Sequence, residues 1–224
     1  MNWLLFDSGP GKPANNMALD EALLEAMPRL QKPVLRLYGW TEQAATFGYF
    51  QKFAEVEPAT LLRPLIRRPT GGGIVPHECD WTYSLTFPVG HEWHSLRAED
   101  SYRRVHEWIQ AAFARMGIET ELSPCSKKSL PGQCFSGHEK HDLLWYGKKI
   151  AGAAQRRTKQ GLLIQGSVQP PPLTLNREAW QRAMLDATPG DWSELSLEAD
   201  VELAARTQEL AAHKYARMEY NQRR

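Results

Sequence analysis

The segment 67–77, RRPTGGGIVPH, constrains the fold of this chain more than any other stretch. Its three consecutive glycines can adopt positive φ and let the backbone approach a ligand, at an entropic cost of about 0.5–1 kcal/mol each relative to alanine. Successive backbone N–H groups in such a loop can surround an anion, and Arg67 and Arg68 add permanently charged donors. The segment predicts a binding loop or, more simply, a glycine-rich hairpin with two solvated arginines.

The glycine loop matches neither of the common nucleotide-binding patterns. It is not GxGxxG, and it lacks the Lys-Ser/Thr pair that ends a P-loop. An apolar run at 61–66 precedes it, and residues 82–87 follow with alternating apolar and polar side chains. We therefore expect the loop to join two strands of a sheet.

Composition limits the class of protein. The 224 residues include 27 basic and 26 acidic side chains, a balance that argues against a general nucleic-acid binder. Three cysteines at irregular spacing, Cys79, Cys125 and Cys134, argue against a disulfide framework and for free thiols in a reducing compartment. The first residues lack the pattern of a signal peptide, and no run reaches the length of a membrane span. We expect one domain, residues 1–224, in the cytoplasm, without membrane association.

Hydrophobic periodicity predicts an alternation of strands and helices. Helices are expected from a cap at Asn15 or Asn16 to Pro28, then at 99–116, 176–185 and 197–215. Asp20, in the first helix, is expected to be a solvated charge, although it could instead fix an arginine. Gly48 is expected to mark a bulge. Strands are expected at 3–6, 34–38, 45–49, 65–68, 82–87, 118–122, 142–145, 149–154 and 161–168, the last three as a meander.

Four segments in this order and spacing carry a family resemblance: NMALDEALLE, RRPTGGGIVPH, GKKIAGAAQRR and LLIQGSV. Together they resemble the superfamily of lipoate-protein ligases, octanoyltransferases and biotin ligases over nearly the whole chain. The resemblance implies an α+β fold, like that of class II aminoacyl-tRNA synthetases, with a mixed, mostly antiparallel sheet flanked by helices. It also implies that the glycine loop and the lysine hairpin face one acyl-binding pocket.

The resemblance assigns the catalytic lysine to Lys149, directly before Ile-Ala-Gly. An ammonium bordered by small residues can reach a carbonyl or phosphate oxygen, whereas the simpler interpretation is a solvated hairpin lysine like Lys148. The residues expected to bind substrate or acyl group are Arg67, Arg68, Gly71, Gly72, Gly73, His77, Gly152, Gln165 and Gly166.

Cys134 is the residue expected to distinguish between the reactions of this superfamily. Cys134-Phe135 resembles the cysteine of one group of octanoyltransferases, which carries the acyl group as a thioester. Two features depart from that group: residues 136–145 read SGHEKHDLLW, and Gln165 stands where a histidine is usual. The simpler interpretation of Cys134 is a small buried thiol.

The predicted function is attachment of an octanoyl or lipoyl group to a lysine of a lipoyl carrier domain, through a Cys134 thioester and without a cofactor. The alternative enzyme is a lipoate-protein ligase that uses ATP and Mg²⁺ and forms an acyl-adenylate. A non-catalytic acyl-binding module is the third hypothesis. The resemblance implies an acyl carrier protein or free lipoate as donor, and lipoyl domains of 2-oxoacid dehydrogenase complexes or the glycine-cleavage H protein as acceptors.

Cys134, His138 and His141 also form a Cys-x3-His-x2-His pattern, with three side chains of the types that bind zinc. His77 or Cys79 could supply a fourth ligand. The spacing matches no standard structural zinc site, so we predict solvated histidines here and no metal.

Overall fold

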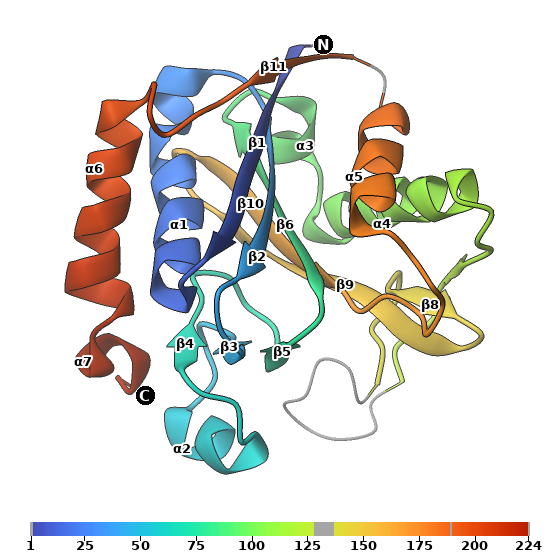
Figure 1. Ribbon diagram of the computed structural model, residues 1–224, viewed down its shortest axis with the longest axis horizontal. Helices are drawn as coiled ribbons and strands as arrows, with labels where there is room; N and C mark the ends of the chain where they lie inside the picture. Colours follow the sequence, from blue (N-terminus) through green and yellow to red (C-terminus); the bar gives the residue numbers. More distant parts are fainter. Residues whose placement is uncertain (1, 128–136, 189, 224) are drawn as a thin grey trace.

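The computed structural model describes residues 2–127, 137–188 and 190–223. The described residues form an eight-stranded sheet in the order β11-β1-β2-β6-β10-β9-β8-β7 and a three-stranded sheet in the order β4-β3-β5 (Figure 1). In the large sheet β1 is parallel to both β11 and β2, and every other neighbouring pair is antiparallel. The predicted mixed, mostly antiparallel sheet is confirmed.

The elements follow one another along the chain as β1 (Asn2–Gly11), α1 (Pro13–Leu30), β2 (Val34–Trp40), β3 (Ala44–Phe47), α2 (Phe53–Val56), a 3-10 turn (Glu57–Ala59), β4 (Leu65–Arg67), β5 (Val75–His77), β6 (Trp81–Pro88), α3 (Glu92–Ser95), α4 (Ala98–Arg115), β7 (Glu121–Leu122), β8 (Leu143–Trp145), β9 (Lys148–Arg157), β10 (Gly161–Val168), α5 (Arg177–Asp186), β11 (Asp191–Glu194), α6 (Val201–Leu210), a π-helical turn (Ala211–Tyr215) and α7 (Met218–Asn221).

Both faces of the large sheet are covered by helices. Side chains alternate between the two faces along each strand, so each strand contributes to both cores. In β1, Trp3 packs into the core that α4 and α5 cover, and Leu4 packs into the core that α1 and α6 cover. Figure 1 shows the two helix pairs on opposite sides of the sheet. The face covered by α1 and α6 also carries most of the polar side chains described below.

The small sheet positions the glycine loop. Strand β3 pairs in parallel with β4 and antiparallel with β5, so residues 68–74 connect its two outer strands. We predicted that the loop joins strands, and this is confirmed, although β5 was not predicted. Strand β3 belongs to the small sheet, whereas its predicted companion β2 lies in the large one.

Several other boundaries differ from the predictions. Strand β1 continues through the turn-forming residues as far as Gly11, because Gly9 (φ 62°) takes up a bulge in its pairing with β2. Helix α1 begins at Pro13 and includes Pro28, and α6 begins only at Val201, where Asp200 caps it. Strand β7 has two residues, and β11 was not predicted. The helix at 99–116 and the meander are confirmed as α4 and β8 to β10.

Within the described part of the chain, no helix combines the length and the apolar character needed to cross a membrane.

Candidate functional site

A pocket opens between the small sheet and the β9–β10 hairpin of the large sheet. It brings together six of the predicted site residues from four separate segments: Arg68, His77, Lys149, Gly152, Gln165 and Gly166. The other described residues along its wall are Met17, Tyr38, Thr46, Val75, Thr82, Ala153, Ala154 and Ser167. Six of these fourteen residues are glycine or apolar and eight carry a polar or charged side chain, so the wall offers both apolar and polar contacts to a small molecule.

Lys149 enters the pocket as half of a buried ion pair. Its Nζ lies 2.7 Å from Oδ2 of Asp142, and the two side chains are 6% and 0% exposed. Oδ1 of Asp142 accepts a hydrogen bond from the Tyr102 hydroxyl, and the Glu139 backbone N–H donates to Oδ2 at 2.6 Å. Three donors therefore hold the carboxylate, which in turn holds the Lys149 ammonium in place.

Gly152 is required beside this pair. A Cβ at this position would lie 2.6 Å from Cε and 2.7 Å from Nζ of Lys149. The absence of a side chain thus leaves the space that the lysine occupies. Gly166, on the neighbouring strand β10, leaves room for the ring of Tyr83, which an added Cβ would overlap.

Burial suppresses ionisation of the groups around Asp142. It is the main cause that raises the pKa of Tyr102 well above its usual value, and the charge of Asp142 adds to the effect. Burial likewise lowers the pKa of His106 to about 4, although Asp142 opposes this shift. Both side chains are therefore neutral at pH 7.

Cys134 lies outside the described residues. The described residues before and after it, Lys127 and His138, pair through two backbone hydrogen bonds of 2.7 and 2.9 Å. The same segment reaches the lysine pair, because Glu139 donates to Asp142. Glu139, in the described segment that follows Cys134 in the sequence, thus contacts the partner of Lys149.

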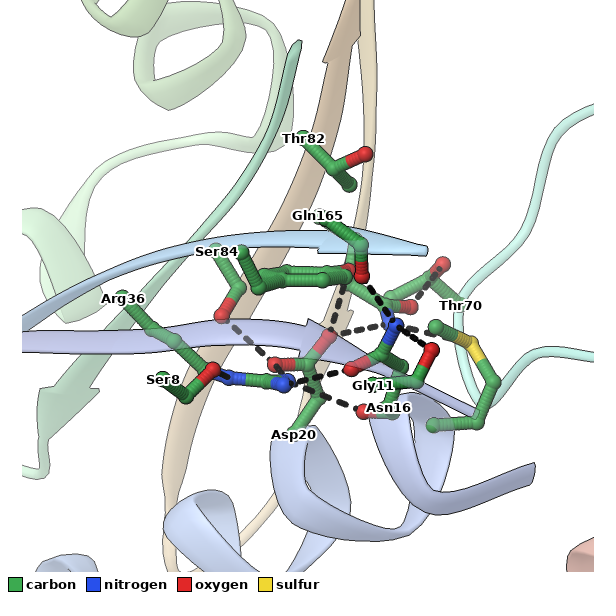
Figure 2. A network of polar contacts seen from close by, with 12 residues as sticks. Ser8, Gly11, Asn16, Asp20, Arg36, Thr70, Thr82, Ser84 and Gln165 are labelled. Carbon is green, nitrogen blue, oxygen red and sulfur yellow. Dashed lines mark hydrogen bonds and ion pairs between the residues drawn. The ribbon is translucent and has the colours of Figure 1, made fainter. Parts of the chain in front are cut away.

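Asp20 is buried rather than solvated, so the prediction of a surface charge was wrong and its alternative, fixing an arginine, is confirmed. Its carboxylate forms a 2.7 Å ion pair with Arg36 and accepts hydrogen bonds from Tyr38 and Ser84 at 3.0 and 2.6 Å. Gln165 donates to it at 2.7 Å (Figure 2). The Arg36 guanidinium also donates to Ser8 and Asn16, so the pair is bonded on all sides.

Gln165 connects this buried cluster to the glycine loop. Its Oε1 accepts from the hydroxyl of Thr70 at 2.7 Å, while its Nε2 donates to Asp20 (Figure 2). One side chain on β10 therefore fixes the start of the loop relative to α1. Gln165 was predicted to contact substrate, and the hydrogen bonds give it a positioning role within the pocket wall.

The two adjacent arginines point to different places. Arg68 lines the pocket and donates to the carbonyl of Gly71 from Nε and Nη2, at 3.1 and 2.6 Å. Arg67 is fully buried, and its guanidinium donates to backbone carbonyls of Tyr49, Gln51 and Asn221. These contacts give Arg67 a structural role, and its predicted contact with substrate stays a prediction.

The glycine loop itself packs closely against β3. Gly72 has a φ of 85°, which favours glycine, and an added Cβ on Gly48 would overlap the Gly72 carbonyl oxygen. Gly48 thus permits close approach of two backbones instead of marking a bulge. Gly71, Gly72 and Gly73 are not among the described residues that line the pocket, so their contact with a ligand stays a prediction.

His77 is held by two side chains. Nδ1 lies 2.9 Å from Asp80, Nε2 lies 2.8 Å from the Thr46 hydroxyl, and the ring stacks on Trp40. His138 instead contacts Ser123, and His141 contacts Glu99. Cys79 and Cys125 are free, exposed thiols, as predicted. Among the described residues no group of three or more potential metal ligands occurs.

The sequence did not indicate several residues that form this site. Tyr102 and Thr46 act through partners 40 and 31 residues away, so no local spacing marks them. Asp142 and Asp80 also have partners nearby in the sequence, Lys149 and His77, but we did not interpret those spacings as pairs. The available signal was weak: Asp142 directly precedes a strand that pairs with the one carrying Lys149.

Known structures share this fold. Protein Ta0514 from T. acidophilum superposes with a TM-score of 0.83 over 100% of both chains, at 20% identity. A lipoate-protein ligase A bound with ATP gives a TM-score of 0.76 over 99% of this chain and 98% of that one, at 19% identity. These likenesses concern the fold alone, and they confirm the predicted lipoate-ligase architecture.

Sequence comparison gives a more specific result. Octanoyltransferase LipM of Carboxydothermus hydrogenoformans is 36% identical over 174 residues, and that of Bacillus subtilis is 35% identical over 181 residues. Each alignment covers 74% of this chain and 64% of the relative, so the match spans just under two thirds of the relatives' length. The model of the lipoyl protein ligase A/B catalytic domain matches residues 12–169, and the chain belongs to this family.

Proposed function

We propose that this chain is an acyltransferase that attaches an octanoyl or lipoyl group to a lysine of a lipoyl carrier domain through a thioester on Cys134. The observation that carries the proposal is the buried Lys149–Asp142 pair at the pocket wall, where Gly152 leaves room for it. The named activity of the relatives, octanoyl transfer, supports the same reaction.

The pair suits acyl transfer because the reaction develops negative charge on a carbonyl oxygen. A fixed ammonium in a site sheltered from water stabilises that oxyanion without reorganising at the moment of reaction. Asp142 restrains Lys149 so that its charge stays at one position. The apolar part of the wall, which includes Met17, Val75 and Ala154, suits the hydrocarbon chain of the acyl group.

One thioester exchange makes up the first half of the reaction. The Cys134 thiolate attacks the carbonyl of a donor thioester, the carbon–sulfur bond of the donor breaks, and the donor thiolate leaves and takes up the proton that Cys134 lost. In the second half the amine of the carrier lysine attacks the Cys134 thioester. An amide forms, Cys134 regains its proton, and no cofactor is consumed.

Partners follow from this chemistry. The donor is proposed to be an octanoyl acyl carrier protein, and the acceptors are lipoyl domains of 2-oxoacid dehydrogenase complexes and the glycine-cleavage H protein. The acyl group is proposed to enter the pocket, with the carriers contacting the surface around it.

Mass spectrometry of the intact protein tests the proposal. Incubation with an octanoyl carrier protein should add the mass of one octanoyl group to the protein, and subsequent addition of an apo lipoyl domain should move that mass to the domain. Cys134→Ser should form no stable adduct and lose nearly all transfer, because a serine hydroxyl without a strong base is a poor nucleophile at neutral pH.

A parallel incubation with lipoate, ATP and Mg²⁺ distinguishes the ligase hypothesis. In a ligase the carrier lysine attacks an acyl-adenylate directly, so Cys134→Ser would retain its ATP-dependent rate. Such a result would replace the transferase with the ligase. If the parent protein modified no carrier in either incubation, the acyl-binding module would be the remaining interpretation.

A further inference from the structure

Thr46, His77 and Asp80 form a chain of hydrogen bonds beside the pocket. The Thr46 hydroxyl lies 2.8 Å from Nε2 of His77, and Nδ1 of His77 lies 2.9 Å from Oδ2 of Asp80. The three residues come from β3, β5 and the turn before β6, and they are 2%, 4% and 6% exposed. Thr46 and His77 line the pocket, and Asp80 lies behind them.

The neighbours of Asp80 determine the direction of these hydrogen bonds. The Trp40 indole N–H donates to the Thr82 hydroxyl at 2.7 Å, so Thr82 donates its own proton to Oδ2 of Asp80 at 3.0 Å. Ser167 donates to the same oxygen at 2.7 Å. The carboxylate is thus an acceptor, which places the His77 proton on Nδ1 and leaves the lone pair of Nε2 facing the Thr46 hydroxyl.

The carboxylate that contacts His77 has one oxygen without a hydrogen-bond partner in the described part of the chain. Oδ1 of Asp80 is buried and has no hydrogen-bond partner among the described residues, so the charge of this carboxylate is not fully compensated locally. Two arginines interact with these residues: Nη1 of Arg68 donates to Thr46 at 3.4 Å, and Asp80 influences Arg177 electrostatically. An imidazolium at His77 would pair with Asp80.

The proposed transfer needs such a base. The carrier lysine arrives as an ammonium, and its conversion to an amide releases two protons, of which Cys134 takes back one. Lys149 Nζ already contacts Asp142 at 2.7 Å. In the described pocket wall, His77 is a candidate base: Asp80 orients its ring, and the Thr46 hydroxyl connects its Nε2 to the pocket.

We propose that Thr46, His77 and Asp80 form a proton relay that deprotonates the incoming carrier lysine, an inference that rests on the proposed acyl transfer. The Thr46 oxygen accepts a proton from the ammonium while its own proton passes to Nε2 of His77, and Asp80 stabilises the imidazolium. The free amine then attacks the acyl carbonyl, and His77 returns its proton to solvent.

The test compares two nucleophiles on the same acylated protein. The carrier lysine must lose a proton before attack, whereas hydroxylamine is uncharged at neutral pH and needs no such step. His77→Gln and Thr46→Val should slow transfer to the carrier by about 10²- to 10⁴-fold, the usual contribution of general base catalysis. Cleavage by hydroxylamine should change far less, and Thr46→Ser, which restores a hydroxyl, should recover most of the carrier rate.

Two outcomes would overturn the relay. Equal slowing with both nucleophiles would mean that the three residues only shape the pocket, and unchanged transfer to the carrier in Thr46→Val would show that the hydroxyl carries no proton. Thr46→Val nearly preserves side-chain shape, so it keeps the test usable if His77→Gln does not fold. Failure of the transferase proposal would appear separately, as a parent protein that forms no acyl adduct.

Discussion

The two buried ion pairs beneath the pocket differ in how completely they are enclosed. Asp20 and Arg36 lie between α1 and the large sheet, and both members bond to further polar groups on several elements. Asp142 directly precedes β8 and Lys149 lies on β9, where it lines the pocket. The difference indicates that the first pair holds elements together, whereas the second presents a charge to a ligand.

The chemistry of the two cations reinforces this division. Arginine cannot lose its proton under these conditions, so Arg36 without Asp20 would be a buried charge with no means of neutralisation. Lysine and aspartate can each change protonation state when a partner is removed. Removing one partner from the Asp142–Lys149 pair should therefore reduce stability less, and activity more, than removing one partner from the Asp20–Arg36 pair.

The largest expected effect is on the stability of the enclosed pair. Asp20→Asn should lower the free energy of unfolding by about 3–5 kcal/mol, because it leaves Arg36 buried without a counter-charge. Urea unfolding of parent and variant measures this, with exposed Glu119→Gln as the control expected to be near parent. A loss below about 1 kcal/mol would remove the distinction between the pairs.

The second prediction concerns the pair that faces the pocket. Lys149→Met should reduce acyl transfer by about 10²- to 10³-fold through loss of oxyanion stabilisation. Lys148→Met on the exposed neighbouring position is the matched control and should retain the parent rate. Initial rates of carrier modification measure both variants, and equal losses would show that the wrong lysine of the hairpin has been assigned.

The third prediction uses the neutral imidazole beside Asp142. Burial lowers the pKa of His106 to about 4, below its value of about 6.5 in an unfolded chain, so the unfolded state binds more protons between these limits. His106 thus contributes stability above pH 6.5 that is lost as the pH falls toward 4, up to about 3 kcal/mol.

Urea unfolding at several pH values from 4 to 7 measures this contribution. His106→Leu should show a flatter dependence than the parent, and the difference between the two curves isolates the histidine. Parallel curves for parent and variant would mean that the imidazole is protonated in the folded protein at these pH values, which would contradict the conclusion that burial keeps His106 neutral.

The smallest effect is expected at the link between the enclosed pair and the glycine loop. Gln165→His should cost less than about 1 kcal/mol, because an imidazole can also donate to Asp20 with one nitrogen and accept from Thr70 with the other. Gln165→Leu loses both bonds and leaves buried polar groups unpaired, so it should cost about 1–3 kcal/mol. Thermal unfolding compares the two, and the reverse order would mean that the link contributes nothing.

Elements with strong local signals were predictable from the sequence. The amphipathic period of α4 marks it directly, and Tyr146 and Gly147, both with positive φ, form the tight connection between β8 and β9. Lys149 lies at the pocket as expected, but the family resemblance rather than its neighbours in the sequence distinguished it from Lys148. The signals of α4 and of the β8–β9 connection are local. These features depend on neighbours a few residues apart.

The remaining features depend on contacts that local sequence does not encode. Asp20 is buried because Arg36, Ser84 and Gln165 meet it in space, although they lie up to 145 residues away. Arg67 and Arg68 look equivalent in the sequence, but consecutive side chains leave a strand on opposite sides, and only packing decides which one faces the pocket. Strand β11 is short and polar, so nothing in its composition marked it.

The contact between Arg67 and Asn221 has a consequence for synthesis of the protein. The side-chain oxygen of Asn221 accepts a hydrogen bond from the Arg67 backbone N–H, and its backbone carbonyl accepts one from the Arg67 guanidinium. Asn221 follows Arg67 by 154 residues. At about 5–20 residues per second a ribosome needs between about 8 and 30 s to cover that interval. During this time the strand that leads into the glycine loop lacks its anchor, so a nascent chain completes its core strands well before it can complete its binding loop.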